Sequence, residues 1–126
     1  MRGGASAIVT IASGLAAAVA PGFGPYGAAK AFLEAASRIW AQDLAGSGVD
    51  VNVLLPGGAA DTDLLPPSPD RKGADGYLLC PGVMRAPILR LASDASTGHT
   101  GERYIARLWN GPETARDPGI AKPRIM

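Results

Sequence analysis

The sequence is poor in residues that form covalent cross-links and metal sites, with one cysteine, Cys80, and one histidine, His99, among 126 residues. A single cysteine cannot form a disulfide within the chain, which is typical of a reducing compartment, so we expect a cytoplasmic protein. One cysteine and one histidine also fall short of a tetrahedral ligand set, so no metal site is predicted. We expect Cys80 to be a small buried residue rather than a nucleophile.

Excess charge and long apolar runs are missing as well. Lysine and arginine number 12, aspartate and glutamate 11, and the formal net charge is +1. This balance offers no general attraction for nucleic acid or an anionic membrane, so neither is predicted as a partner. No apolar run approaches the ~20 residues of a membrane-spanning helix, and residues 5–20 do not resemble a signal peptide. With 47% hydrophobic residues, the composition indicates one globular domain.

The hydrophobic pattern that is present alternates between strands and helices. Strand patterns occupy residues 7–12, 49–55 and 103–108, and helical patterns occupy about 25–45 and 81–93. This order predicts a parallel sheet with right-handed crossovers and helices on both faces. The first helix is apolar on more than one side, so we expect it to pack on the sheet and on a second surface.

Two segments lack a regular pattern. Residues 56–80 are rich in proline, and loops of this length are usually functional or disordered. From Asn110 onward the chain is again rich in proline and has little apolar content. We therefore predict one domain over residues 1–109 and a surface or disordered tail over 110–126.

Three polar residues form the strongest candidate site. Tyr26 and Lys30 stand four residues apart at the start of the first predicted helix, and Ser13 follows the first predicted strand. The spacing places the tyrosine and the lysine on one helix face. Reduction of a carbonyl leaves an alkoxide that must receive a proton as it forms. A free tyrosine ionises near pH ~10, a nearby ammonium favours the phenolate, and a serine hydroxyl can hold the substrate oxygen.

These residues belong to an ordered series of motifs. The series comprises a strand ending in Ser13, the helix start Pro25–Lys30, a strand ending in Pro56-Gly57, and the stretches Leu91–Ser96 and Thr100–Ile105. Over residues 5–109 it resembles the second half of the short-chain dehydrogenase/reductase family, and several motifs in order are far more specific than one alone. The resemblance implies an α/β fold, the C-terminal portion of a Rossmann-like doubly wound parallel sheet with about three strands and two main helices.

The same resemblance implies an NAD(P)-dependent oxidoreductase that interconverts an alcohol and a carbonyl on a small-molecule substrate. In such an enzyme Tyr26 would transfer the proton, Lys30 would favour the phenolate, and Ser13 would hold the substrate oxygen. The helix at residues 25–45 would form the interface of a homo-oligomer, and residues 56–80 would form a substrate lid.

The cofactor implied by the resemblance is NAD or NADP. Its nicotinamide end would lie against Tyr26 and Lys30, with the lysine on the ribose. Pro56 and Gly57 would let the backbone pass close to the nicotinamide, and Thr62 would bond its carboxamide.

Parts of the family pattern are absent from these 126 residues. The T-G-x-x-x-G-x-G turn that cradles the pyrophosphate is not found, nor is the Asn-Asn-Ala-Gly stretch whose asparagine completes the catalytic group. Gly22–Gly27 spells G-x-G-x-x-G, but the strand before it ends near Ser13 and the next strand ends without a carboxylate, so we interpret it as a loop. We therefore expect the C-terminal half of such an enzyme, inactive alone, with residues 7–12 as an exposed sheet edge.

An alternative hypothesis remains open. The chain could be a non-catalytic remnant or a dimerisation module without cofactor binding. In that case Tyr26 is an aromatic residue at a helix start, Lys30 a solvated charge and Ser13 a cap at a strand end.

Overall fold

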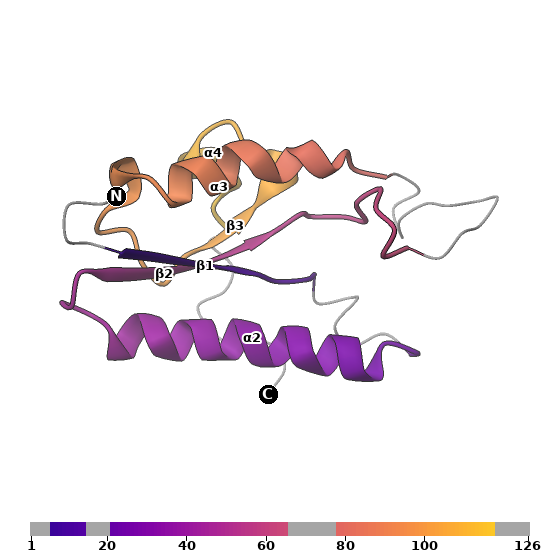
Figure 1. Cartoon of the computed structure of the whole chain (residues 1–126), viewed down its shortest axis with the longest axis horizontal. Helices are drawn as coiled ribbons and strands as arrows, with labels where there is room; N and C mark the ends of the chain where they lie inside the picture. Colours follow the sequence, from indigo (N-terminus) through magenta and orange to yellow (C-terminus); the bar gives the residue numbers. More distant parts are fainter. Residues whose placement is uncertain (1–5, 15–20, 66–77, 118–126) are drawn as a thin grey trace.

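A computed structural model of the chain describes residues 6–14, 21–65 and 78–117. Its strands are β1 (Ser6–Ile11), β2 (Val49–Leu55) and β3 (Arg103–Ile105), and its α-helices are α2 (Gly24–Asp43), α3 (Arg85–Leu91) and α4 (Pro112–Ala115). The three strands form a parallel sheet in the order β1-β2-β3. Figure 1 shows α2 on one face of the sheet and α3 and α4 on the other. The predicted α/β fold with a parallel sheet is confirmed.

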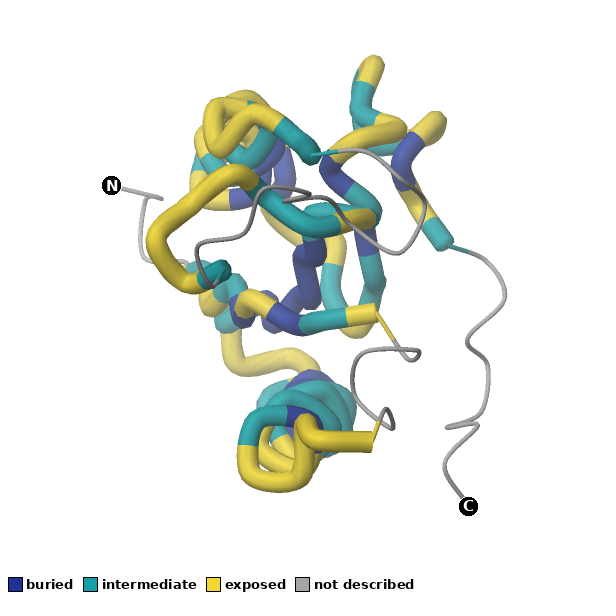
Figure 2. Tube along the Cα trace, turned by 90° about the vertical axis from the view of Figure 1, so that its right-hand side faces the viewer, coloured by how far each residue is buried: buried dark blue, intermediate teal, exposed yellow. Residues whose placement is uncertain are grey.

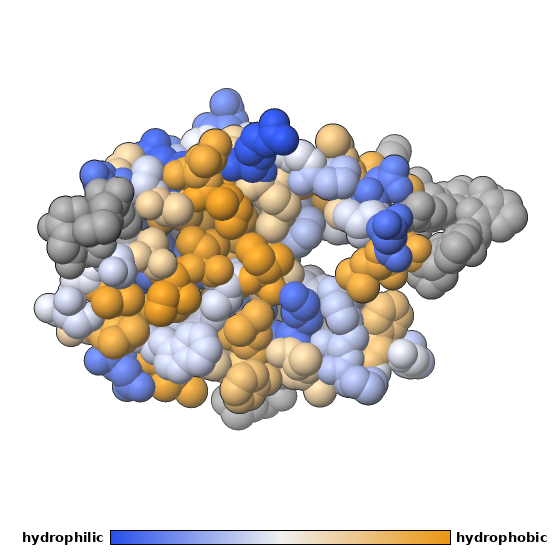
Figure 3. Space-filling model, viewed as in Figure 1, coloured by the Kyte–Doolittle hydropathy of each residue, from blue (hydrophilic) through white to orange (hydrophobic). Residues whose placement is uncertain are grey.

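The central strand, β2, is almost wholly buried. Residues 50–55 are buried on both faces, as expected for a parallel strand covered by helices on each side. β1 pairs with β2 from Ser6↔Val49 to Ile11↔Leu54. Within the described residues β1 is an edge strand, and Ile8 and Ile11 on it are 38% and 36% exposed. Figure 3, in the same view as Figure 1, shows apolar side chains gathered at the level of the sheet.

Two polar side chains of β2, Asp50 and Asn52, hold the turn that leads into β3. The Asn52 side-chain amide donates to the carbonyl of His99 at 2.8 Å, and its oxygen accepts from the Glu102 N–H at 3.1 Å. The Gly98 N–H donates to Asp50 Oδ2 at 2.8 Å. Asn52 is only 1% exposed, and its bonds satisfy its buried polar atoms, which would otherwise be costly. These contacts set where β3 begins.

Helix α2 faces the sheet with small residues. Its buried positions are Gly27, Ala36, Ser37 and Ala41, which let the helix lie close to β1 and β2. Figure 2 shows that the buried side of α2 is the one turned towards the sheet. The helix starts with Pro25 in its first turn and stops ahead of Gly46, whose φ is +77°, in agreement with the sequence pattern.

Two predicted elements are shorter than expected. The strand predicted over 103–108 ends at Ile105, and Ala106–Leu108 form a 3-10 helix, in which the Trp109 N–H donates to the carbonyl of Ala106 at 3.0 Å. The helix predicted over 81–93 is a 3-10 turn at Pro81–Met84 followed by α3. Pro87 has no N–H to donate, so regular α-helix is compatible with it only in the first turn, which explains a start at Arg85.

Two further expectations about burial were wrong. Cys80 is exposed rather than buried, because it precedes a surface 3-10 turn in extended conformation. Within the predicted tail, Pro112–Ala115 form α4, and Ala115 is fully buried against Leu54 and Tyr104. Besides this alanine, the bridge between Tyr104 and Arg116 and the bond from the Asp117 N–H to the Arg103 carbonyl hold the segment, which composition could not reveal. Residues 118–126 of the tail, and residues 66–77 of the predicted lid, lie outside the described part.

Candidate active site

Ser13 and Tyr26 meet at the carboxyl end of β1. Ser13 lies just past the end of β1, and Tyr26 is in the first turn of α2. The Tyr26 hydroxyl donates to Ser13 Oγ at 3.5 Å, and both residues are partly buried. This separation is longer than the usual ~2.7–2.8 Å of a hydroxyl bond. A third oxygen about 2.7 Å from each hydroxyl would satisfy both distances with neither hydroxyl moved.

Lys30 lies one turn beyond Tyr26 on the same face of α2. Its Nζ donates to the carbonyl of Ile11 at 2.8 Å and stands 5.9 Å from the centre of the Tyr26 ring. This distance is close to the ~6 Å limit of a cation–π contact. The carbonyl bond occupies one of the three donors of the ammonium, so the charge is held beside the phenol with donors to spare.

Phe23 is a neighbour of the site that sequence reasoning missed. Its ring packs edge-to-face against Tyr26, with centroids 6.0 Å apart and an interplanar angle of 64°. Such a contact restricts how the phenol ring can turn. Phe23 caps the start of α2, so an aromatic residue one turn ahead of Tyr26 was the signal that could have indicated it.

Pro56 and Gly57 lie at the same edge of the sheet as Ser13, because β1 and β2 run parallel and the Ala12 N–H donates to Leu54 at 2.9 Å. Gly57 has φ +88°, and a Cβ there would lie 2.5 Å from Ile105 Cγ2 and 2.8 Å from Arg107 Cγ. Packing on β3 alone thus requires glycine at this position, whatever the site binds.

Thr62 lies in a turn beyond Pro56-Gly57. Its N–H donates to the carbonyl of Ala60 at 2.9 Å, just after the bridge between Ala60 and Leu79 that joins the two stems of the 56–80 segment. The residue is exposed. Ser13, Tyr26 and Lys30 are therefore joined by direct contacts, Pro56 and Gly57 share their edge of the sheet, and Thr62 belongs to the turn beyond.

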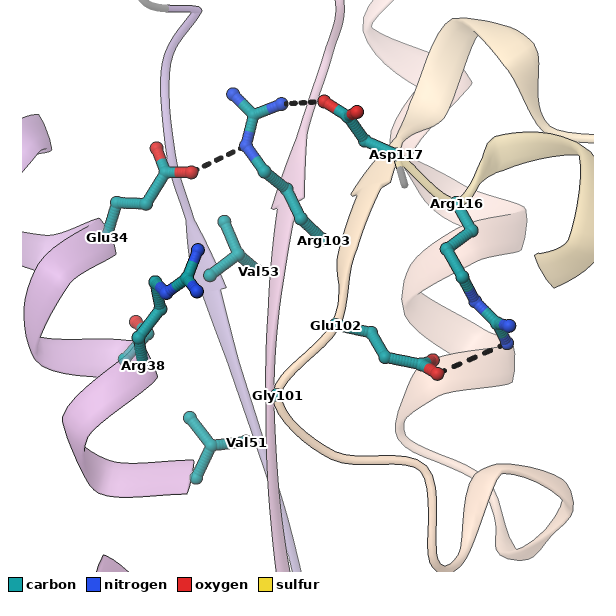
Figure 4. A pocket seen from close by; sticks show the side chains of 10 residues that line it. Glu34, Arg38, Val51, Val53, Gly101, Glu102, Arg103, Arg116 and Asp117 are labelled. Atoms are coloured by element: carbon teal, nitrogen blue, oxygen red, sulfur yellow. Dashed lines mark hydrogen bonds and ion pairs between the residues drawn. The ribbon is translucent and has the colours of Figure 1, made fainter. Parts of the chain in front are cut away.

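A separate pocket lies between α2 and the start of β3 (Figure 4). Arg103 in this pocket contacts Glu34 and Asp117, and Arg116 contacts Glu102 at 3.3 Å. Behind it, Tyr104 is 1% exposed and its hydroxyl donates to Glu102. Burial, with the bond to Glu102 and its charge, raises the pKa of Tyr104 to about 12. Among the described residues, no cluster of histidine, cysteine and acidic side chains could hold a metal ion.

Comparison with known proteins points to one family. A family model described as Enoyl-(Acyl carrier protein) reductase matches residues 1–106. A Picea abies short-chain type dehydrogenase/reductase is 42% identical over 64 residues, which are 51% of this chain and 23% of that protein. An Arabidopsis thaliana NADPH-dependent aldehyde reductase-like protein, chloroplastic by name, is 38% identical over 56 residues, which are 44% of this chain and 21% of that protein.

Solved structures show the same relationship in three dimensions. A Beutenbergia cavernae protein, assigned provisionally as an NAD(P)-dependent gluconate 5-dehydrogenase and solved with NADP, is 27% identical with a TM-score of 0.61. The match covers 82% of this chain and 45% of that one. A short-chain dehydrogenase/reductase family protein is 31% identical with a TM-score of 0.61, over 79% of this chain and 43% of that one.

The match is therefore broad in this chain but partial in its relatives, since it spans less than a quarter of the curated proteins and less than half of the solved ones. In the part of the chain that the structure describes, no helix is both long and apolar enough to cross a membrane. The sheet, the order of the motifs and the family match over residues 1–106 agree, and the chain belongs to the short-chain dehydrogenase/reductase family.

Proposed function

We propose that this chain carries the proton-transfer half of an NAD(P)-dependent oxidoreductase that interconverts an alcohol and a carbonyl. The observation that carries the proposal is the pair of hydroxyls of Ser13 and Tyr26, 3.5 Å apart, with the Lys30 ammonium 5.9 Å from the phenol ring. Membership of an oxidoreductase family supports the reaction class. The substrate is a small molecule with a carbonyl or hydroxyl group.

Each of the three side chains has one task in this proposal. A substrate oxygen between the hydroxyls accepts a bond from Ser13 and takes its proton from Tyr26 as negative charge develops on it. The Lys30 ammonium stabilises the phenolate left behind, and the oxidation direction runs the same transfer in reverse. The bond from Lys30 to the Ile11 carbonyl holds the charge where it is needed.

The residues fit the nicotinamide end of NAD or NADP. Lys30 retains donors for ribose hydroxyls after bonding Ile11, and Pro56-Gly57 bring backbone without a side chain to the same edge. A bound nicotinamide would supply or accept the hydride. The pyrophosphate normally lies on a glycine turn and a helix N-terminus, and the sequence has no T-G-x-x-x-G-x-G stretch, so we expect the isolated chain to bind the dinucleotide weakly and to be inactive.

We also propose that α2 pairs with a second copy of the chain. Phe32 and Ile39 on α2 are 69% and 54% exposed, and they lie away from the buried Gly27, Ser37 and Ala41. Together with the open β1 edge, this surface also supports the second candidate, a non-catalytic remnant or dimerisation module. A cytoplasmic location remains a prediction from the single cysteine.

Transplanting the chain separates the two candidates. Residues 5–109 replace the corresponding segment of the Picea abies relative, and reduction of aldehydes and ketones is measured with NADH and with NADPH. Turnover that is abolished by Tyr26→Phe supports the enzyme. Ser93→Ala, which removes a hydroxyl outside the site, should leave that turnover unchanged. A folded chimaera without turnover favours the remnant. A second experiment titrates the 126-residue chain with NADH and NADPH and follows binding by fluorescence. Micromolar binding would contradict the expected weak affinity.

A further inference from the structure

The helix that carries Tyr26 and Lys30 buries only small side chains. Its buried residues are Gly27, Ala36, Ser37 and Ala41. Burial of apolar surface stabilises roughly in proportion to area, and small side chains provide little area and few projections to interlock. Directional polar contacts therefore have a larger part in fixing where α2 lies along the sheet.

Those polar contacts form one stripe along α2. Tyr26, Lys30, Glu34 and Ser37 follow each other at spacings of three or four residues, which places them on one helix face. Tyr26 contacts Ser13, and Lys30 contacts the Ile11 carbonyl. Ser37 Oγ lies 2.7 Å from Thr10 Oγ1, and Glu34 accepts from Arg103 at 2.5 Å. Every residue of the stripe is thus tied to another element.

The contact to Arg103 is the charged one, and it links three segments. The Arg103 Nε donates to Glu34 Oε1 on α2, and its Nη1 donates to Asp117 Oδ2 beyond α4 at 2.7 Å. Figure 4 shows the guanidinium between the two carboxylates. Its side chain is 12% exposed, against 20% for Glu34 and 23% for Asp117. The backbone adds a bond from the Asp117 N–H to the Arg103 carbonyl at 2.8 Å.

Because Arg103 is also paired with Val53 in the sheet, its position is set by β2 and β3. Glu34 lies about 12 Å from Tyr26 along the helix axis, at ~1.5 Å per residue. A helix moves as a stiff body over this length, so a displacement at Glu34 reaches the phenol. A misplacement of about 1 Å at a reacting group can cost about 10²-fold in rate.

We propose that Arg103 is a positioning residue for Tyr26. By holding Glu34 against the sheet it fixes the axial position of α2, and with it the spacing of the Tyr26 and Ser13 hydroxyls. Through Asp117 the same guanidinium makes that spacing depend on how the segment that follows β3 packs against the sheet. The inference rests on the proposed function of Tyr26.

The test follows the Tyr26 phenol directly in the whole chain. Tyrosine labelled with ¹³C at Cζ is incorporated, and the Tyr26 signal is assigned with Tyr26→Phe. We expect Arg103→Met and Glu34→Gln to shift this signal, and Asp117→Asn to shift it less. Arg103→Lys should give a signal between those of Arg103→Met and wild type. Arg116→Met is the matched control, because it removes an ion pair in the same pocket, to Glu102, without touching α2.

Identical Tyr26 signals in wild type, Arg103→Met and Glu34→Gln would overturn the proposal, as would an equal shift in Arg116→Met. Glu34→Gln keeps the size of the side chain and removes only its charge, so it keeps the test decisive if Arg103→Met fails to fold. The signal needs no turnover, so its outcome is independent of the proposed function. In an active chimaera, Arg103→Met is expected to lower kcat by about 10- to 100-fold with little change in KM, and a change in KM alone would count against positioning.

Discussion

The two ends of the sheet use their polar groups in opposite ways. At the amino end of β3, the Asn52 side chain from β2 is 1% exposed, and its amide bonds the His99 carbonyl and the Glu102 N–H at 2.8 and 3.1 Å. At the carboxyl end of β1, the hydroxyls of Ser13 and Tyr26 are partly exposed and 3.5 Å apart. Short, saturated bonds indicate groups committed to the fold, whereas hydroxyls with bonding capacity to spare are available to a ligand. The contrast places the candidate site at the carboxyl end.

Replacement of the Tyr26 hydroxyl should give the largest functional effect. Tyr26→Phe keeps the ring and its contact with Phe23, so the fold should persist while proton transfer is lost. General acid–base groups contribute about 10²–10⁴-fold in rate, and we expect a loss of kcat of this size in the active chimaera. A near-normal kcat would show that Tyr26 is structural and remove the contrast between the two ends.

Replacement of Asn52 should have the reverse profile. Asn52→Leu removes two hydrogen bonds, to the carbonyl of the exposed His99 and from the N–H of the partly buried Glu102, and each such bond contributes about 0.5–1.5 kcal/mol. We expect the free energy of unfolding, measured with urea, to fall by up to about 3 kcal/mol. The Tyr26 ¹³C signal of the folded fraction should stay in place, and its movement would mean that the two ends are coupled.

Gly57 tests whether a residue at the carboxyl end can be structural. Gly57→Ala introduces a Cβ 2.5 Å from Ile105 Cγ2 at φ +88°. Overpacking and positive φ each cost about 1–3 kcal/mol, so unfolding without any cofactor should become easier by about 2 kcal/mol or more. Gly101→Ala is the control, because its φ is +73° but a Cβ there meets only Ala41 at 3.7 Å. Equal losses in both variants would show that backbone conformation, rather than contact with β3, is the constraint.

Tyr104 gives the smallest effect, which depends on pH. Its pKa is raised from 10.0 to about 12 by burial and by Glu102, so between these values the folded chain keeps a proton that the unfolded chain loses. Stability from neutral Tyr104 is therefore complete below about pH 10 and is lost as the pH rises through about 12, at up to about 1.4 kcal/mol per unit. Urea unfolding at about pH 9 and pH 11 should show this slope in wild type and a flatter one in Tyr104→Phe. Equal slopes would contradict it.

Much of the fold could be predicted because its signals are local. The apolar run at Val49–Leu55, the alanine-rich α2 and the order of motifs predicted a parallel α/β sheet and the family, and both are confirmed. Predictions failed where a boundary depended on a distant partner. The segment at Pro112–Ala115 is ordered because Ala115 enters the core beside Leu54 and because Arg116 and Asp117, which follow it, pair with Glu102 and Arg103.

The candidate site divides in the same way. The sequence by itself determined that Tyr26 and Lys30 share a helix face and that Ser13 and Pro56-Gly57 follow parallel strands, since helix period and strand direction are properties of short stretches. Only the tertiary structure decided that Phe23 packs on the phenol, that Gly57 is confined by β3, and that Arg103 joins Glu34 to Asp117. The physical reason is that a contact between residues far apart in the chain depends on how helices and strands are packed, and this information is not present in either segment alone.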